Sequence, residues 1–281
     1  MALCLAEMAV DVLNCAGGRT KTALSHKHAG AWFAARAAGE PLPVGQATPP
    51  PRPARPEKPE LLDPRKVPRR RPGSPQGRVA LLHAVAHIEL NAVDLHWDIV
   101  ARFAKVDMPP GFYDDWVKAA AEESKHFNLV CDCLEALGSH YGALPAHAGM
   151  WRAAEDTADD LMGRLAVVPM VLEARGLDVT PGMIEIFRNA HEDQTVAALE
   201  LIYAEEVGHV AYGSKWFHFL CGRHNIDPKG EFHRLVRRYF HASLKPPFNE
   251  EKRAEAGLPP DFYWPLADQT PPGAQKRKPS P

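Results

Sequence analysis

Two stretches of the chain carry the same pattern, a glutamate pair followed by two other residues and a histidine. These residues are Glu122, Glu123 and His126 in the first stretch, and Glu205, Glu206 and His209 in the second. Residues three apart share a face of an α-helix, so Glu123 with His126, and Glu206 with His209, can each present a carboxylate and an imidazole to one metal ion.

Two further glutamates lie in apolar strings, Glu89 in ALLHAVAHIEL and Glu173 in LAVVPMVLEARGL. Glu89 precedes Glu123 by 34 positions and Glu173 precedes Glu206 by 33, which indicates a repeated pair of helices. A buried, uncompensated carboxylate costs several kcal/mol, so we predict that metal ions hold the four glutamates and two histidines together. Glu200 has equally apolar neighbours but no partner histidine.

This donor set also suggests which metals would bind. Four carboxylates neutralise two divalent ions, and oxygen with imidazole ligands favours iron first and manganese second over copper. Six ligands leave positions open on two ions, where dioxygen can bind. The prediction is an O2-activating oxidase or hydroxylase with a small-molecule substrate. The chain has no flavin or nicotinamide fingerprint, so electrons would come from a donor protein or from the substrate.

The elements that must position these residues are helices, because no segment alternates as a strand would. We expect an all-α fold, a four-helix bundle, with Pro169 opening the third long helix before Glu173. The first three expected helices run from Pro75 to about Lys105, from about Tyr113 to Leu137, and from about Met150 to Arg175 with Gly176 as its stop. A further helical stretch, capped by Thr180 and Pro181, leads through residues 189–191 into a fourth long helix that ends near Gly222, and a fifth helix covers about Gly230 to Ala242.

The 27 prolines divide the chain, since 12 lie in residues 41–75 and 9 follow residue 245. The expected units are a helical pair (1–40), a proline- and arginine-rich arm (41–75), the bundle (76–245), and a C-terminal strap with a disordered tail (246–281). The arm is either a disordered linker or a segment lying across the body.

The arm is basic, although the whole chain carries a formal charge of only -2. Its run Arg69, Arg70 and Arg71 is a candidate contact for nucleic acid, specifically tRNA. The alternative is that the arginines pair with carboxylates of an acidic body.

The cysteines and the apolar segments bear on the location of the protein. Five cysteines without a C-x-x-C pair indicate reduced thiols and a cytoplasmic setting. No apolar run is long enough to span a membrane. Glu7 and Asp11 interrupt the apolar N-terminus, which predicts an amphipathic helix packed on the body rather than a signal peptide.

From Gln76 to Cys221 the chain resembles the ferritin-like di-iron or di-manganese carboxylate superfamily, in which two helices each give one Glu and two each give E-x-x-H. A wider set of strings is similar to an uncharacterised bacterial ferritin-like family, which is distantly similar to the tRNA hydroxylase that modifies an isopentenyl adenosine. These strings are RRRPGSPQGRVALLHAVAHIELNAVDL, FYDDWVKAAAEESKHF, VLEARGLDVTPGM, EEVGHVAYGSKWF and KPPFN.

The resemblance implies a role for each ligand. Glu123 and Glu206 would bridge the metals, Glu89 and Glu173 would be terminal ligands, and His126 and His209 would each complete one metal. It also implies that Glu122 and Glu205 orient the histidines across the bundle, the alternative being that both face solvent. Tyr203 and Tyr212 flank the ligands of their helix and would donate hydrogen bonds or a radical, or else only pack.

Three other functions stay open. The first is a tRNA-modifying hydroxylase. The second is iron handling or manganese-catalase-like removal of peroxide, although terminal straps would crowd a storage cage and favour a monomer or dimer. The third is a metal-free helical scaffold whose buried acids pair with Arg102, Arg164 or Arg175.

Overall fold

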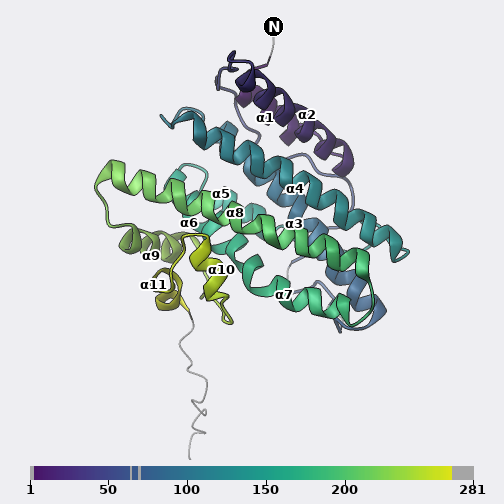
Figure 1. Cartoon of the computed structure of the whole chain (residues 1–281). Coiled ribbons are helices and arrows are strands. Elements are labelled where there is room, and N and C mark those ends of the chain that lie inside the picture. Colours follow the sequence, from purple (N-terminus) through teal and green to yellow (C-terminus); the bar gives the residue numbers. More distant parts are fainter. Residues whose placement is uncertain (1–2, 64, 69–70, 268–281) are drawn as a thin grey trace, which may run out of the picture.

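The computed structural model describes residues 3–63, 65–68 and 71–267 (Figure 1). Over these residues the regular structure is helical, and the β-type contacts are two isolated bridges, Leu61 to Ala146 and Leu244 to Ala267. The expectation of an all-α protein is therefore confirmed. None of the described helices combines the length and hydrophobicity that crossing a membrane requires.

Two short N-terminal helices cover one side of the body. Helix α1 spans Leu5–Asn14 and packs on α3, while α2 spans Gly18–Ala37 and packs on α4. Leu5, Ala9 and Val12 are fully buried, as expected for an amphipathic helix.

Three long helices carry most of the residues predicted to bind metal: α3 (Pro75–Arg102), α4 (Pro110–Ala136) and α8 (Asp193–His224). Helix α3 begins where predicted, because the Ser74 hydroxyl accepts a hydrogen bond from the Gly77 amide at 3.1 Å. It packs along α4, and α4 packs along α8 (Figure 1). Every residue from Glu89 to Ala101 is buried, so α3 is the central helix of the body.

The third predicted helix, Met150 to Arg175, is wrong as a single element. The structure has α5 (Gly149–Asp156), a break, α6 (Leu161–Val167), a π-helical segment η1 (Val168–Glu173) and α7 (Ala174–Arg188). The break follows from two side chains. Asp160 caps α6 by accepting from the Gly163 amide at 2.8 Å, and Arg164 donates to the Ala154 carbonyl at the end of α5, at 2.7 Å.

The π-helical segment contains Pro169, where the sequence predicts that the helix opens. Proline has no N–H to donate, which permits the wider turn. The segment packs on α8 at Gly213, where an added Cβ would lie 2.5 Å from Pro169. Glu173 is the last residue of the wide turn, so this local geometry sets its position.

Gly176 does not stop the helix, and Thr180 with Pro181 does not start a new one. Both positions lie inside α7, which runs on to Arg188. Pro181 cannot donate to the Leu177 carbonyl, and the side chain of Asn249 donates to it instead, at 3.3 Å. A contact from a distant part of the chain therefore permits the interior proline.

The described part of the arm lies across the body rather than forming a free linker. Arg52 pairs with Glu155 at 2.6 Å, and Arg55 reaches buried Asp94 at 3.2 Å. The Ala54 amide donates to the carbonyl of Leu13 in α1. These arginines therefore pair with carboxylates of the body.

The C-terminal segment also packs on the body, through α9, α10, α11 and the 3-10 turn η2. Their bounds are Pro228–Tyr239, Glu250–Glu255, Pro260–Tyr263 and Trp264–Leu266. Arg253 of α10 pairs with buried Asp178 of α7 at 2.7 Å. The predicted disordered tail, the last residues of the chain (QKRKPSP), lies outside the described residues.

Candidate metal centre

Four of the predicted ligands form one buried cluster at the centre of the body. Helix α3 contributes Glu89, α4 contributes Glu123 and His126, and α8 contributes Glu206, and one donor atom from each lies within 4.8 Å of the others. Glu123 and His126 reach the same point because they lie three apart on one helix face. Glu89 and Glu123 are 5% and 1% exposed, so the cluster is shielded from water.

His209 and Glu173 lie beside this cluster rather than in it. Glu123 connects the cluster to His209, since its Oε1 lies 2.9 Å from His209 Nδ1 and its Oε2 lies 3.4 Å from His126 Nδ1. Glu206 Oε1 is likewise 3.4 Å from His209 Nδ1 and 3.7 Å from His126 Nδ1. Two carboxylates therefore lie between the two imidazoles, which is the placement that bridging ligands need.

Several of these buried atoms have no hydrogen-bond partner among the described residues. They are the Nδ1 atoms of His126 and His209, Oε2 of Glu123 and Oε2 of Glu173. The contacts within the cluster are short but do not have hydrogen-bond geometry. Buried polar atoms are nearly always satisfied, so four lone-pair donors converging on one region fit a site for metal cations.

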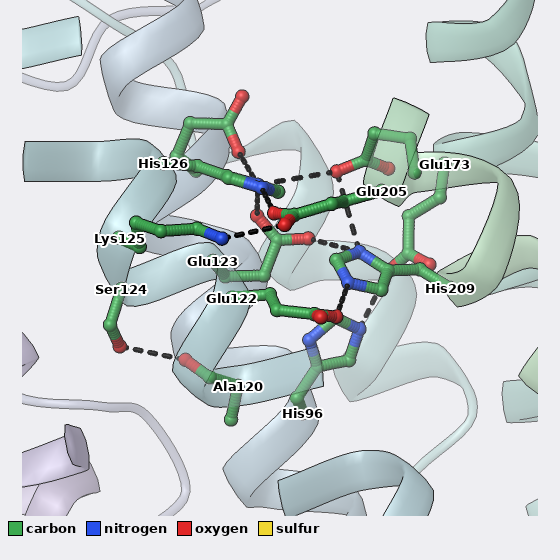
Figure 2. Close-up of polar contacts among 12 residues, drawn as sticks. His96, Ala120, Glu122, Glu123, Ser124, Lys125, His126, Glu173, Glu205 and His209 are labelled. Atoms are coloured by element: carbon green, nitrogen blue, oxygen red, sulfur yellow. Dashed lines mark hydrogen bonds and ion pairs between the residues drawn. The ribbon is translucent and has the colours of Figure 1, made fainter. Parts of the chain in front are cut away.

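The outer nitrogen of each histidine is held by a glutamate from the opposite helix (Figure 2). His126 Nε2 of α4 donates to Glu205 of α8 at 2.7 Å, and His209 Nε2 of α8 donates to Glu122 of α4 at 3.0 Å. The two glutamates are partly exposed, and Lys125 also pairs with Glu205 at 2.6 Å. Because Nε2 carries the hydrogen bond, Nδ1 of each ring is directed at the cluster.

The charges of the cluster perturb its ionisation strongly. Burial, together with the neighbouring Glu123 charge, raises the pKa of Glu89 to about 8. Burial acts to lower the pKa of His126 and His209, but the surrounding glutamates outweigh it and raise both pKa values well above the usual one. The hydrogen bond from His126 lowers the pKa of Glu205 to about 2. Without cations, the site therefore retains protons near neutral pH.

The arginines that a metal-free scaffold would use pair elsewhere. Arg164 and Arg102 both bind Asp98, each at 2.6 Å, and Arg175 contacts Asp178 at 3.3 Å. Among the described residues, no arginine or lysine forms an ion pair with the cluster glutamates or with the carboxylate on η1. This pattern removes the main support for the scaffold alternative.

Other sequence candidates have ordinary surroundings. The Tyr203 hydroxyl accepts from Asn249 at 2.7 Å, and the Tyr212 ring lies 6.4 Å from the His209 ring between centroids. Glu200 is exposed and pairs with Arg188.

The proposed nucleic-acid contact is only partly described. Arg69 and Arg70 lie outside the described residues. Arg71 is exposed, and its carbonyl accepts from the Ser74 hydroxyl at 2.8 Å beside the start of α3. The structure therefore leaves an RNA contact here as a prediction.

One residue of the site was missed from the sequence. His96 on α3 is fully buried and its Nε2 lies 3.0 Å from Glu173 Oε1. His96 follows Glu89 by seven residues, which is two helical turns, so the same helical periodicity could have identified it.

Comparison with known proteins gives a family but no activity. The family described as "Protein of unknown function (DUF455)" matches residues 14–264. A Haemophilus influenzae protein described as "Uncharacterized protein" is 42% identical over 208 residues, which cover 72% of this chain and 72% of that protein. No solved structure gives a significant match.

Proposed function

Since the chain belongs to the DUF455 family, whose function is unknown, we propose its function from the site itself: a dinuclear iron or manganese carboxylate protein that activates dioxygen as an oxidase or hydroxylase. The observation that carries the proposal is the set of buried donor atoms without hydrogen-bond partners. Two imidazole nitrogens and two carboxylate oxygens of this kind converge from α4, α8 and η1.

A ferritin-like bundle is the finer fold that we propose for these helices. Its four members would be α3, α4, the run from α6 through η1 to α7, and α8. Each of the first and third gives one glutamate, and each of the second and fourth gives E-x-x-H, in the order found in ferritin-like di-metal proteins. The packing of α3 on α4, and of α8 on η1 and α7, supports this assignment.

Each residue would have a defined role in holding the ions. Glu123 and Glu206 would bridge, since both lie between the two imidazoles. Glu89 and Glu173 would be terminal ligands, and His126 and His209 would bind one ion each through Nδ1. A bound pair of redox-active ions would supply the capacity to activate dioxygen and oxidise a substrate.

The outer glutamates would tune the two histidines. Glu122 and Glu205 accept from the Nε2 atoms, which fixes each ring and makes its Nδ1 more basic towards a cation. Both carboxylates are partly exposed and lie beside lysines. Reducing electrons would come from a partner protein or from the substrate.

Metal analysis tests this proposal directly. Purified protein should contain about two iron or manganese ions per chain, because the donor set neutralises two divalent charges. Glu123→Ala and Glu206→Ala should each lose most of the metal while retaining helical circular dichroism. Glu200→Ala is the matched control, because Glu200 lies on α8 but is exposed. A folded wild-type chain that binds neither metal in stoichiometric amount would refute the proposal.

An oxygen electrode separates the candidate chemistries. Iron-loaded protein with a chemical reductant should consume dioxygen, and the two alanine variants should not. Evolution of dioxygen from hydrogen peroxide by manganese-loaded protein would instead favour the catalase-like alternative.

A further inference from the structure

The second half of the centre, around His209 and Glu173, contains a buried imidazole that is not one of the six proposed ligands. His96 is 0% exposed on α3, and its ring stacks on Trp116 at 5.3 Å and meets the edge of the His209 ring at 5.6 Å between centroids. Its only polar contact among the described residues is Glu173 (Figure 2). Burying an imidazole costs free energy unless the ring gains something specific in return.

The contact with His96 engages one of the two carboxylate oxygens of Glu173 and leaves the other one unpaired among the described residues. An ionised carboxylate can only accept, so His96 Nε2 carries the proton and donates to Oε1 at 3.0 Å. Oε2 is buried and has no hydrogen-bond partner among the described residues. Oε2 is therefore the oxygen that has no competing contact and is free to bind a cation.

In the part of the chain that the structure describes, no equivalent group contacts Glu89 in the other half of the centre. The repeat places Thr180 seven residues after Glu173, as His96 follows Glu89 by seven. A threonine is too short to replace the imidazole. Glu89 Oε2 instead lies 3.4 Å from His126 Nδ1, inside the four-residue cluster. The pseudo-symmetry of the ligands is thus broken at this position.

Resting on the proposed di-metal function, we propose that His96 is a positioning residue for Glu173: it holds Oε1 so that Oε2 alone binds the ion on the His209 side, which makes the two metal positions unequal. The four-residue cluster forms the first position without help from His96. The second position depends on Glu173, at the end of a π-helical turn, and His96 is the residue that holds one oxygen of this carboxylate in place.

Stepwise metal binding tests this inference. Metal-free protein is titrated with Co²⁺, whose visible absorption reports ligation, and metal analysis gives the stoichiometry. The wild type should bind two ions in two distinguishable steps. His96→Leu should bind the first ion normally and the second about 10- to 100-fold more weakly, the usual effect of losing a hydrogen bond to a ligand. His96→Gln should restore most of the second affinity, because its amide can donate to Oε1.

The matched control is His87→Gln. His87 is also buried on α3, but it contacts Tyr141 and the His147 carbonyl outside the centre, so both affinities should be retained. If His96→Leu does not fold, His96→Phe, which keeps the ring contact with Trp116, replaces it. The inference is overturned if the second affinity is unchanged, if both affinities fall equally, or if glutamine fails to rescue. A wild type that binds no Co²⁺ refutes the di-metal function as well.

Discussion

Replacing Glu89 by glutamine should stabilise the metal-free protein and weaken the metal-loaded one. Glu89 is 5% exposed, and burial together with the Glu123 charge raises its pKa from 4.5 to about 8. In the metal-free protein at neutral pH it is therefore protonated, and glutamine has nearly the same shape and no charge. In the unfolded chain the same side chain is ionised, so folding must take up a proton.

The magnitude follows from the pKa difference. The folded pKa is above the unfolded one, so this carboxyl lowers the free energy of unfolding as pH rises from 4.5 towards 8. At 1.36 kcal/mol per pKa unit, the cost is about 3 kcal/mol at pH 7 and about 1 kcal/mol at pH 5. Glu89→Gln removes this cost. The raised pKa values of His126 and His209 also make the free energy of unfolding fall as pH rises. Both histidines are present in the wild type and in the variant, so they contribute little to the difference between the two proteins.

Urea unfolding of chelated wild type and Glu89→Gln at both pH values measures the effect. The variant should be more stable at pH 7 by about 3 kcal/mol and should lose most of that advantage at pH 5. With saturating Mn²⁺ the order should reverse, because the variant lacks a ligand. Glu200→Gln, at an exposed position of α8, should stay within about 0.5 kcal/mol of wild type throughout. A chelated Glu89→Gln protein that is less stable than wild type at pH 7, or a gain independent of pH, would refute this account of the cluster.

Three further predictions concern the support of the centre. Glu205→Gln should weaken metal binding about 10- to 100-fold in equilibrium dialysis, because His126 loses its charged acceptor. Gly213→Ala should cost about 1–3 kcal/mol in urea unfolding, because a Cβ there would lie 2.5 Å from Pro169, whereas Gly208→Ala on the same helix meets no atom within 4 Å and should be tolerated. Chelation should lower the melting temperature: each ion present at 100 times its Kd adds about 2.7 kcal/mol of stability, or about 5–11 °C for a chain of this size.

Each of these has a result that would count against it. Unchanged affinity in Glu205→Gln would mean that the outer carboxylate does not orient its histidine. Equal stability of the two glycine variants would remove the close approach of α8 and η1 as a constraint. Coincident melting curves with and without chelator would leave the buried carboxylates without a stabilising cation.

Helical periodicity explains why much of the site could be predicted from sequence. Glu123 with His126, and Glu206 with His209, needed only the rule that residues three apart share a face. The all-α class could likewise be predicted, from the prolines, glycines and capping residues that mark helix ends and from the lack of strand-like alternation. The rule for residues three or four apart does not reach His96 from Glu89, although two full turns also return to the same face.

Long-range contacts account for the parts that could not be predicted. Nothing near Gly176 or Pro181 in the sequence indicates that the helix continues, because the Leu177 carbonyl that Pro181 leaves without a donor accepts its hydrogen bond from distant Asn249. The break before α6 depends on Arg164 satisfying the end of α5 while it is itself paired with a carboxylate of α3. Local propensity predicts neither arrangement, since both need a partner that only the folded chain supplies.

The hydrogen bond from Asn249 to Leu177 has a consequence for the order in which the protein is made. A ribosome adds about 5–20 residues per second, so residue 249 follows Pro181 by about 3 to 14 s. During that interval Asn249, which donates to the Leu177 carbonyl in the folded protein, is not yet part of the chain, while α8 is already being synthesised. The hydrogen bond that satisfies the interior of α7 is therefore supplied by a part of the chain that is made after every predicted metal ligand.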